Sequence, residues 1–150
     1  MKPEIDKTYL GIFHLKKKFA KGEPTAIIVH HTCTKSPEAT RRALASKGCS
    51  THFEIDKDGH IYQYCGLSYI ASHCGSANCH AIGIDLTHMQ GAAFPQVQLD
   101  AAKALVTWLC GELHIPQVVH ETLSGIYPHR AVGNTACPGN LDMDIFNADV

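Results

Sequence analysis

The stretch Thr25-Ala-Ile-Ile-Val-His-His31 places two histidines at the end of a short, β-branched apolar run. Such a run is typical of a buried strand. Much later in the chain come His129 and Cys137, the latter followed by Pro138-Gly139. Imidazole and thiolate are ligands that zinc prefers, and three protein ligands leave a fourth position for an attacking water. The sequence therefore predicts a catalytic zinc site, because a structural site would use four protein ligands.

The pattern leaves open which histidine of the first pair belongs to the site. Successive side chains of a strand point to opposite faces, so His30 and His31 do not both reach one ion. His120 is a competing ligand, since it also ends an apolar run, Val118-Val119. Turn-forming residues surround His129 and Cys137, which favours a loop that folds back on the end of the sheet.

Length, composition and charge narrow the class of protein. A chain of 150 residues with 45% hydrophobic residues is expected to form one globular domain. The formal net charge of −1 gives no electrostatic footprint for nucleic acid or an anionic membrane. No apolar run approaches the roughly 18 residues of a membrane span. Residues 1–6 lack the apolar stretch of a secretory signal, so we expect a soluble chain without membrane insertion or an export signal of its own.

Seven cysteines and eleven histidines are many for this length, which raises the question of metal or redox chemistry. Cys33 and Cys49 flank a predicted helix of roughly 15 Å, which disfavours a disulfide between them unless the chain folds back. The segment His73–His80 holds two cysteines between two histidines. A short disulfide loop or, with weaker support, a second zinc site there stays open.

The predicted elements alternate between strands and helices, which favours an α/β fold with one mixed central sheet flanked by helices. Ser36-Pro37-Glu38 is a helix start and Gly48 a helix stop. Lys57-Asp58-Gly59 is a hairpin signal. We divide the chain into an approach segment, 1–24, and a catalytic domain, 25–150. The expected strands are 25–31, 51–56, 60–65, 81–87 and a possible 117–121; the expected helices are 36–47, 97–114 and a short closing helix, 141–147.

Several longer motifs occur in one order along the chain. They are Ile-Ile-Val-His-His-Thr at 27–32, Thr-His-Phe-Glu-Ile-Asp-Lys-Asp-Gly-His-Ile-Tyr-Gln at 51–63, Ser-His-Cys-Gly at 72–75, Ala-Ile-Gly-Ile-Asp-Leu at 81–86, and His129 with Cys137-Pro138-Gly139. With these motifs the chain resembles the zinc-dependent N-acetylmuramoyl-L-alanine amidases of the phage-lysozyme and peptidoglycan-recognition-protein superfamily. The resemblance covers about Ile27 to Asn140.

The resemblance implies a function and a ligand set. Such enzymes cut the amide between the lactyl group of N-acetylmuramic acid and L-alanine, in peptidoglycan or in muropeptides. Their fold is a mixed β-sheet flanked by helices, with a substrate groove above the metal. By the resemblance His30, the first of the pair, binds Zn²⁺ together with His129 and Cys137.

The chain departs from the family at two catalytic positions. Many members have a tyrosine where this chain has Thr51, and another branch has a glutamate where this chain has Asp85. Asp85 points away from its apolar neighbours in the strand, so we interpret it as the general base for the attacking water. The other interpretation is a buried acid satisfied by backbone donors.

The remaining candidate residues surround the expected groove. Thr135 stands where relatives place a lysine or threonine near the scissile carbonyl, and it could donate to the developing oxyanion. We expect His73, Thr51 and His31 on the substrate side of the site. Alternatively, His31 or His120 fixes the tautomer of a ligand histidine.

Two other functions compete with the amidase hypothesis. One is a recognition module that binds muropeptides without cutting them, although non-catalytic relatives usually lose the cysteine ligand. The other is an unrelated zinc peptidase, but the chain lacks a His-Glu-x-x-His helix. A monomeric amidase made in the cytoplasm would act at the cell wall or periplasm after release or injection. It could serve as a phage endolysin, a recycling enzyme, or a toxin with an immunity or export partner.

Overall fold

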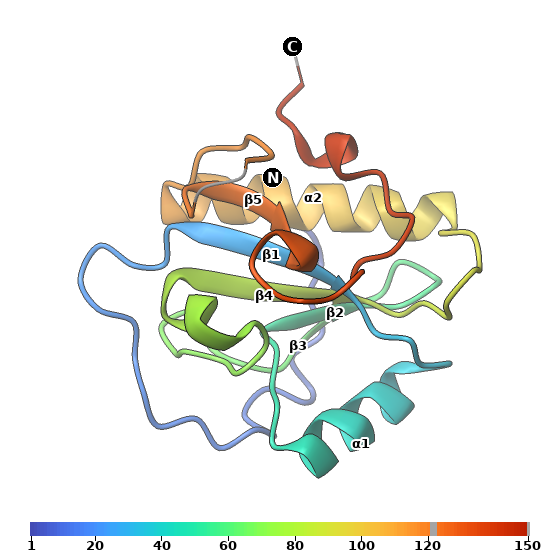
Figure 1. Ribbon diagram of the computed structural model, residues 1–150, viewed down its shortest axis with the longest axis horizontal. Coiled ribbons are helices and arrows are strands. Elements are labelled where there is room, and N and C mark those ends of the chain that lie inside the picture. The colour runs from blue at the N-terminus through green and yellow to red at the C-terminus, as the bar shows by residue number, and fades with distance from the viewer. Residues whose placement is uncertain (121–122, 150) are drawn as a thin grey trace.

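The computed structural model describes residues 1–120 and 123–149. Its centre is one mixed sheet of five strands in the order β3-β2-β4-β1-β5 (Figure 1). Strand β1 runs parallel to both β4 and β5, and β2 runs parallel to β4. Strand β3 runs antiparallel to β2. The strands are β1 Ala26–His31, β2 Phe53–Ile55, β3 Ile61–Gln63, β4 Ala81–Leu86 and β5 Gly125–Pro128. The predicted single-domain α/β fold is thereby confirmed.

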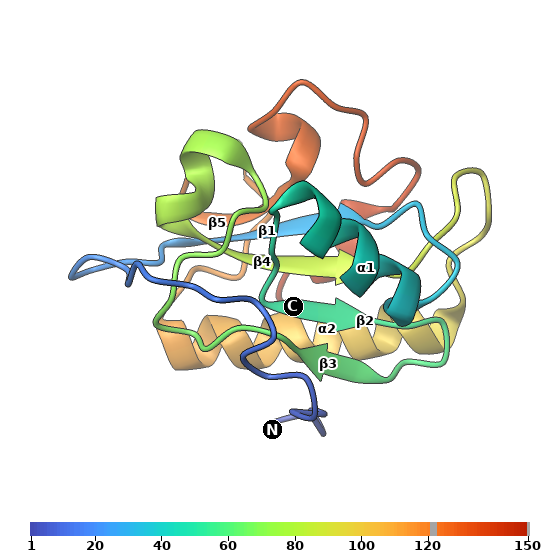
Figure 2. The same cartoon turned by 90° about the horizontal axis from the view of Figure 1, so that it is seen from below.

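Helices cover both faces of the sheet. Figure 2 shows α2 on one side, and α1 with the short helical turns η1 and η2 on the other. The helical elements are α1 Pro37–Lys47, η1 Gly75–His80, α2 Gln96–Leu113, η2 His129–Ala131 and η3 Met143–Phe146. The α2 side is closed by packing, so the opposite side is where loops and α1 leave room for a site.

The main core lies between the sheet and α2. The period of two along β1 sends Ile27 and Val29 to this side, while Ile28 and His30 point to the other. Leu105 and Leu109 of α2 are fully buried against the same core. Burial of several branched side chains on one face fixes the strand register, because a shift by one residue would expose all of them.

Helix α1 begins and ends at the residues that the sequence predicts. The Ser36 hydroxyl accepts the backbone N–H of Ala39 at 3.2 Å, and Pro37 occupies the first turn. Gly48 closes the helix in the left-handed conformation, at φ 67°. These local signals set the two ends of α1, and its place on the side of the sheet that His30 faces is a tertiary contact.

The approach segment, residues 1–24, packs along the β3 side of the domain. Asp6 forms an isolated bridge with Tyr62, and Lys18 forms another with Tyr69. Phe19 packs against the main core and stacks on His52, with 6.0 Å between ring centroids. Among the described helices, none is long and apolar enough to cross a membrane.

The structure differs from two expectations near the C-terminus, and it answers the question that the sequence left open about Cys74 and Cys79. The strand expected at 117–121 is reduced, within the described residues, to a single bridge from Val119 to Ile126, and Glu121 lies outside them. Strand β5 is instead the four residues Gly125–Pro128, too short and too rich in turn formers to show a periodic pattern. The closing helix is only the turn η3, and all seven cysteines are free thiols, so Cys74 and Cys79 form no bridge.

Candidate metal centre

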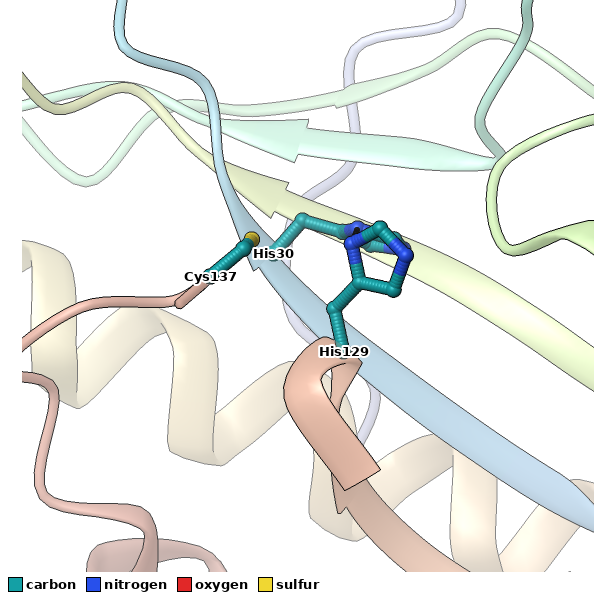
Figure 3. A group of neighbouring side chains, drawn as sticks. All are labelled: His30, His129 and Cys137. Atoms are coloured by element: carbon teal, nitrogen blue, oxygen red, sulfur yellow. Dashed lines mark hydrogen bonds between the residues drawn. The ribbon is translucent and has the colours of Figure 1, made fainter. Parts of the chain in front are cut away.

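Three candidate ligands meet at the ends of two neighbouring parallel strands. His30 is near the end of β1, His129 directly follows β5, and Cys137 comes from the loop beyond it. Their ligand atoms all lie within 4.8 Å of one another, and Figure 3 shows the two imidazoles and the thiol turned toward a common point. Since parallel strands bring their carboxyl ends together, residues a hundred positions apart converge here.

The structure separates the two histidines of the first pair. The side chain of His30 is buried and points to the α1 side, where its Nδ1 lies 3.1 Å from Nδ1 of His129. The ring of His31 turns away, and its Nδ1 lies 3.3 Å from Nδ1 of His88. His31 still contributes through its backbone, because its N–H donates to the sulfur of Cys137 at 3.2 Å.

The competing ligand His120 is not part of this group. Its ring lies close to Gly125, at the start of β5, whereas His129 follows the end of that strand. His120 is exposed, and among the described residues the ligand group consists of His30, His129 and Cys137.

Burial sets the protonation states of the three ligands in the metal-free protein. Loss of hydration holds the pKa of His30 well below its ordinary value of 6.5, and it also lowers the pKa of His129. Both rings are therefore neutral and able to donate a lone pair. Burial raises the pKa of the Cys137 thiol to about 12, so its thiolate form requires a nearby cation. Two neutral imidazoles and one thiol at this spacing fit the donor set of zinc.

Asp85 lies directly beside this group. It is the register partner of His30 across β1 and β4, so both side chains project from the same face of the sheet. The hydroxyl of Thr51 donates to Oδ1 of Asp85 at 3.2 Å. Burial, and next the neighbouring Glu54 carboxylate, raise the pKa of Asp85 to about 8. The alternative was a buried acid satisfied by backbone donors. The donor to Asp85 is instead the side-chain hydroxyl of Thr51.

Thr51 has a different place from the one expected. Its side chain is fully buried and holds Asp85, so it is not exposed for direct contact with a substrate. The expectation of a substrate contact did not include the pairing of β2 with β4. This pairing brings Thr51, two residues before β2, to the carboxyl of Asp85.

Sequence reasoning missed Glu54, a second buried carboxylate in this layer. Glu54 pairs in register with Asp85 across β2 and β4. Its oxygens accept three hydroxyl donors, from Tyr64 at 2.6 Å, Thr87 at 2.6 Å and Thr40 at 2.8 Å. The strand pattern gave no warning, because a glutamate between two apolar residues is ordinarily assigned to the solvent-facing side.

An open cavity of about 390 Å³ adjoins the candidate metal centre. It extends from the two ligand histidines along β4 toward α1, and His73 and His31 line it as expected for a groove. One side of α1, from Thr40 to Lys47, and loop residues with hydroxyl or thiol groups form most of the rest of its wall. The lining residues are His30, His31, Thr32, Thr34, Thr40, Ala43, Leu44, Lys47, Cys49, Ser50, Ser72, His73, Cys74, Gly75, Asp85 and His129.

Thr135 belongs to the loop of Cys137 and not to the wall of this cavity. It is exposed, and its hydroxyl oxygen accepts the backbone N–H of Cys137 at 3.2 Å. The hydroxyl hydrogen is left free to point outward, so the oxyanion role stays a hypothesis.

The chain belongs to the N-acetylmuramoyl-L-alanine amidase family, whose model matches residues 20–140. The match includes every candidate ligand and Asp85. It begins at residue 20, within the segment 1–24.

Two curated relatives are peptidoglycan-recognition proteins. Peptidoglycan-recognition protein SC2 of Drosophila melanogaster and of Drosophila simulans is 33% identical over 89 residues. The matched region is 59% of this chain and 46% of those proteins, so the chain matches about half the length of these curated relatives.

Solved structures give the same fold. The amidase LysC from Clostridium intestinale superposes with a TM-score of 0.74 at 25% identity, covering 92% of this chain and 90% of that one. A Drosophila peptidoglycan-recognition protein LB variant in complex with tracheal cytotoxin superposes with a TM-score of 0.66 at 25% identity, covering 85% of each chain.

Proposed function

We propose that this chain is a zinc-dependent amidase that hydrolyses the bond between N-acetylmuramic acid and L-alanine in peptidoglycan or muropeptides. The observation that supports it most is the group of His30, His129 and Cys137 with Asp85 beside it, on the wall of one open cavity. Three ligands of this type leave room for reacting groups, as in catalytic zinc sites.

In this proposal His30, His129 and Cys137 hold the zinc ion. The ion would polarise the scissile carbonyl and lower the pKa of the attacking water. Asp85 accepts the proton of that water and returns it to the leaving amine of L-alanine. Burial raises the pKa of Asp85 in the metal-free protein, and a cation bound beside it would favour the ionised carboxylate that accepts the proton.

Other residues contribute to binding and charge stabilisation. His73 and His31 line the cavity, where a bound substrate would lie beside them. Although Thr135 does not line the cavity, its hydroxyl is two residues from Cys137 and is proposed to donate to the developing oxyanion.

Recognition without cleavage is the second candidate function, and the Drosophila recognition proteins among the relatives favour it. The presence of Cys137 within the ligand group favours hydrolysis instead. Both functions would use the same cavity, so binding of muropeptides alone does not separate them.

The test incubates the purified chain with whole sacculi and, separately, with soluble muropeptides. We expect release of stem peptides with a free L-alanine amino terminus, detected by mass spectrometry, and loss of release with a chelator or in Cys137→Ala. Cys79→Ala, which removes an exposed cysteine, is the matched control and keeps both zinc and activity. Binding with no release at any zinc concentration would establish the recognition module, and a metal-free Cys137→Ala with full activity would disprove the zinc assignment. The preferred substrate form separates a wall-lytic enzyme from a recycling one.

A further inference from the structure

His73 is hydrogen-bonded to Nε2 of the candidate zinc ligand His30. Nε2 of His30, the nitrogen that faces away from His129, lies 3.0 Å from Nδ1 of His73. The two rings meet at 78°, with 5.2 Å between centroids. This contact joins η1 and its preceding loop to the strand that carries the ligand.

The partner at the far side of His73 fixes the direction of these bonds. Nε2 of His73 lies 3.2 Å from the carbonyl oxygen of Ala81, which can only accept. The thiol of Cys74 lies farther away, at 3.8 Å from the same nitrogen. Nε2 of His73 therefore carries the proton, and Nδ1 of the neutral ring is an acceptor.

The same reasoning then fixes the proton on His30. Because Nδ1 of His73 accepts, Nε2 of His30 must be the donor in the 3.0 Å bond. The lone pair of His30 is consequently on Nδ1, the atom that lies 3.1 Å from Nδ1 of His129. One backbone carbonyl thus determines, through two rings, which nitrogen is offered to the ion.

The fold holds the His73 ring closely in this position. The side-chain oxygen of Asn78 accepts the backbone N–H groups of His73 and Cys74, at 2.9 and 2.7 Å. The ring lies flat against β4 at Gly83, where a Cβ atom would come within 2.7 Å of the His73 Cγ. Because the His73 ring is fixed by these contacts, it can fix the orientation of the His30 ring to which it is hydrogen-bonded.

We propose that His73 is a positioning residue for the metal centre: it holds His30 in the Nε2–H tautomer with Nδ1 directed at the ion. The proposal rests on the zinc site of the proposed function. It gives His73 a role different from substrate contact, and it assigns to His73 the tautomer-fixing role for which the sequence offered His31 or His120. Partners of this kind typically change metal affinity by about 10- to 100-fold when removed.

The experiment compares three variants of the full chain. His73→Phe keeps a flat ring but removes both nitrogens, whereas His73→Asn restores an acceptor near the position of Nδ1. His80→Asn is the matched control, since His80 lies in the same segment but bonds Glu23 at 2.6 Å. The measurement is the zinc dissociation constant by chelator competition, together with kcat and KM on a soluble muropeptide.

We expect His73→Phe to weaken zinc binding by about 10- to 100-fold, His73→Asn to recover most of it, and His80→Asn to leave it unchanged. Unchanged zinc affinity in His73→Phe, with only KM raised, would overturn the positioning role in favour of substrate contact. Failure of the wild type itself to bind zinc would instead contradict the proposed function.

A measurement on the unmodified protein covers the case in which a variant does not fold. Two-bond ¹⁵N–¹H spectra of the zinc-loaded wild type report which imidazole nitrogen carries the proton. Protons on Nε2 of both His30 and His73 are expected, and a proton on Nδ1 of His73 would refute the inference.

Discussion

His30 and Asp85 are register partners on the parallel strands β1 and β4. A candidate metal ligand and a candidate acid–base group therefore leave the sheet side by side, on the face opposite α2. The distance between them is set by strand spacing and does not depend on a flexible loop. Sites built on regular elements in this way hold their geometry more precisely than sites on loops.

Replacing Asp85 tests the separation of metal binding from proton transfer. We expect Asp85→Asn to bind zinc as the wild type does, because Asp85 is not in the ligand group, and to lower kcat by about 10²- to 10⁴-fold. Zinc content and kcat on a soluble muropeptide are measured on the same preparation. Wild-type turnover in Asp85→Asn would remove Asp85 from the mechanism.

The raised pKa of Asp85 also predicts how the stability of the metal-free protein depends on pH. The folded protein holds the Asp85 proton more tightly than the unfolded chain, with a pKa of about 8 against 3.8. This group's stabilising contribution is therefore complete below pH 3.8 and is lost as pH rises through about 8. Thermal unfolding of the chelated protein should show wild type losing stability relative to Asp85→Asn across that interval. If the difference in stability between wild type and Asp85→Asn did not change with pH, the pKa of Asp85 would not be raised in the folded protein.

Glu54 is expected to influence Asp85 by charge. In Glu54→Gln the neighbouring negative charge is gone, so the pKa of Asp85 falls and the acid limb of the kcat profile moves to lower pH. The same change should cost about 1–3 kcal/mol of stability, because an amide cannot satisfy all three hydroxyl donors. An unshifted pH profile in a folded Glu54→Gln protein would contradict this coupling.

Gly83 is predicted to be required by the ring of His73. A Cβ in Gly83→Ala would lie 2.7 Å from that ring, which should destabilise the fold by about 1–3 kcal/mol and weaken zinc binding. Gly111→Ala is the control, because a Cβ there meets nothing within 4 Å and should stabilise α2 by about 0.5–1 kcal/mol. Chemical denaturation and chelator competition measure both effects. If the two substitutions behaved alike, the close approach at Gly83 would not matter.

Thr135 offers a test of charge stabilisation at the loop of Cys137. We expect Thr135→Val to lower kcat on the order of 10²-fold if its hydroxyl donates to the oxyanion, while Thr135→Ser keeps most of the activity. Zinc affinity is measured in parallel, because the Thr135 oxygen also accepts the Cys137 N–H. A loss of zinc in Thr135→Val would assign the residue to the ligand loop and not to catalysis.

Local signals in the sequence predicted much of the fold. Ser36 and Gly48 bound α1 because capping depends on residues only a few positions away. The apolar face of β1 predicted a buried strand, and the later His129 and Cys137 predicted a metal site. Strand β5 escaped prediction because Gly125–Pro128 is held by pairing with β1, a contact that no local pattern encodes.

By itself the sequence determined which chemical groups are present, the elements from β1 to α2 and the family to which the chain belongs. The resemblance indicated His30 and not His31 as the ligand, and the tertiary structure places its ring against His129. Only the tertiary structure decided that Thr51 lies under Asp85 and that His73 stands behind His30. The physical reason is that side-chain identity and short-range backbone preferences are written along the chain. Contacts between strands depend on which strands become neighbours and in what register, and burial of the whole core decides that.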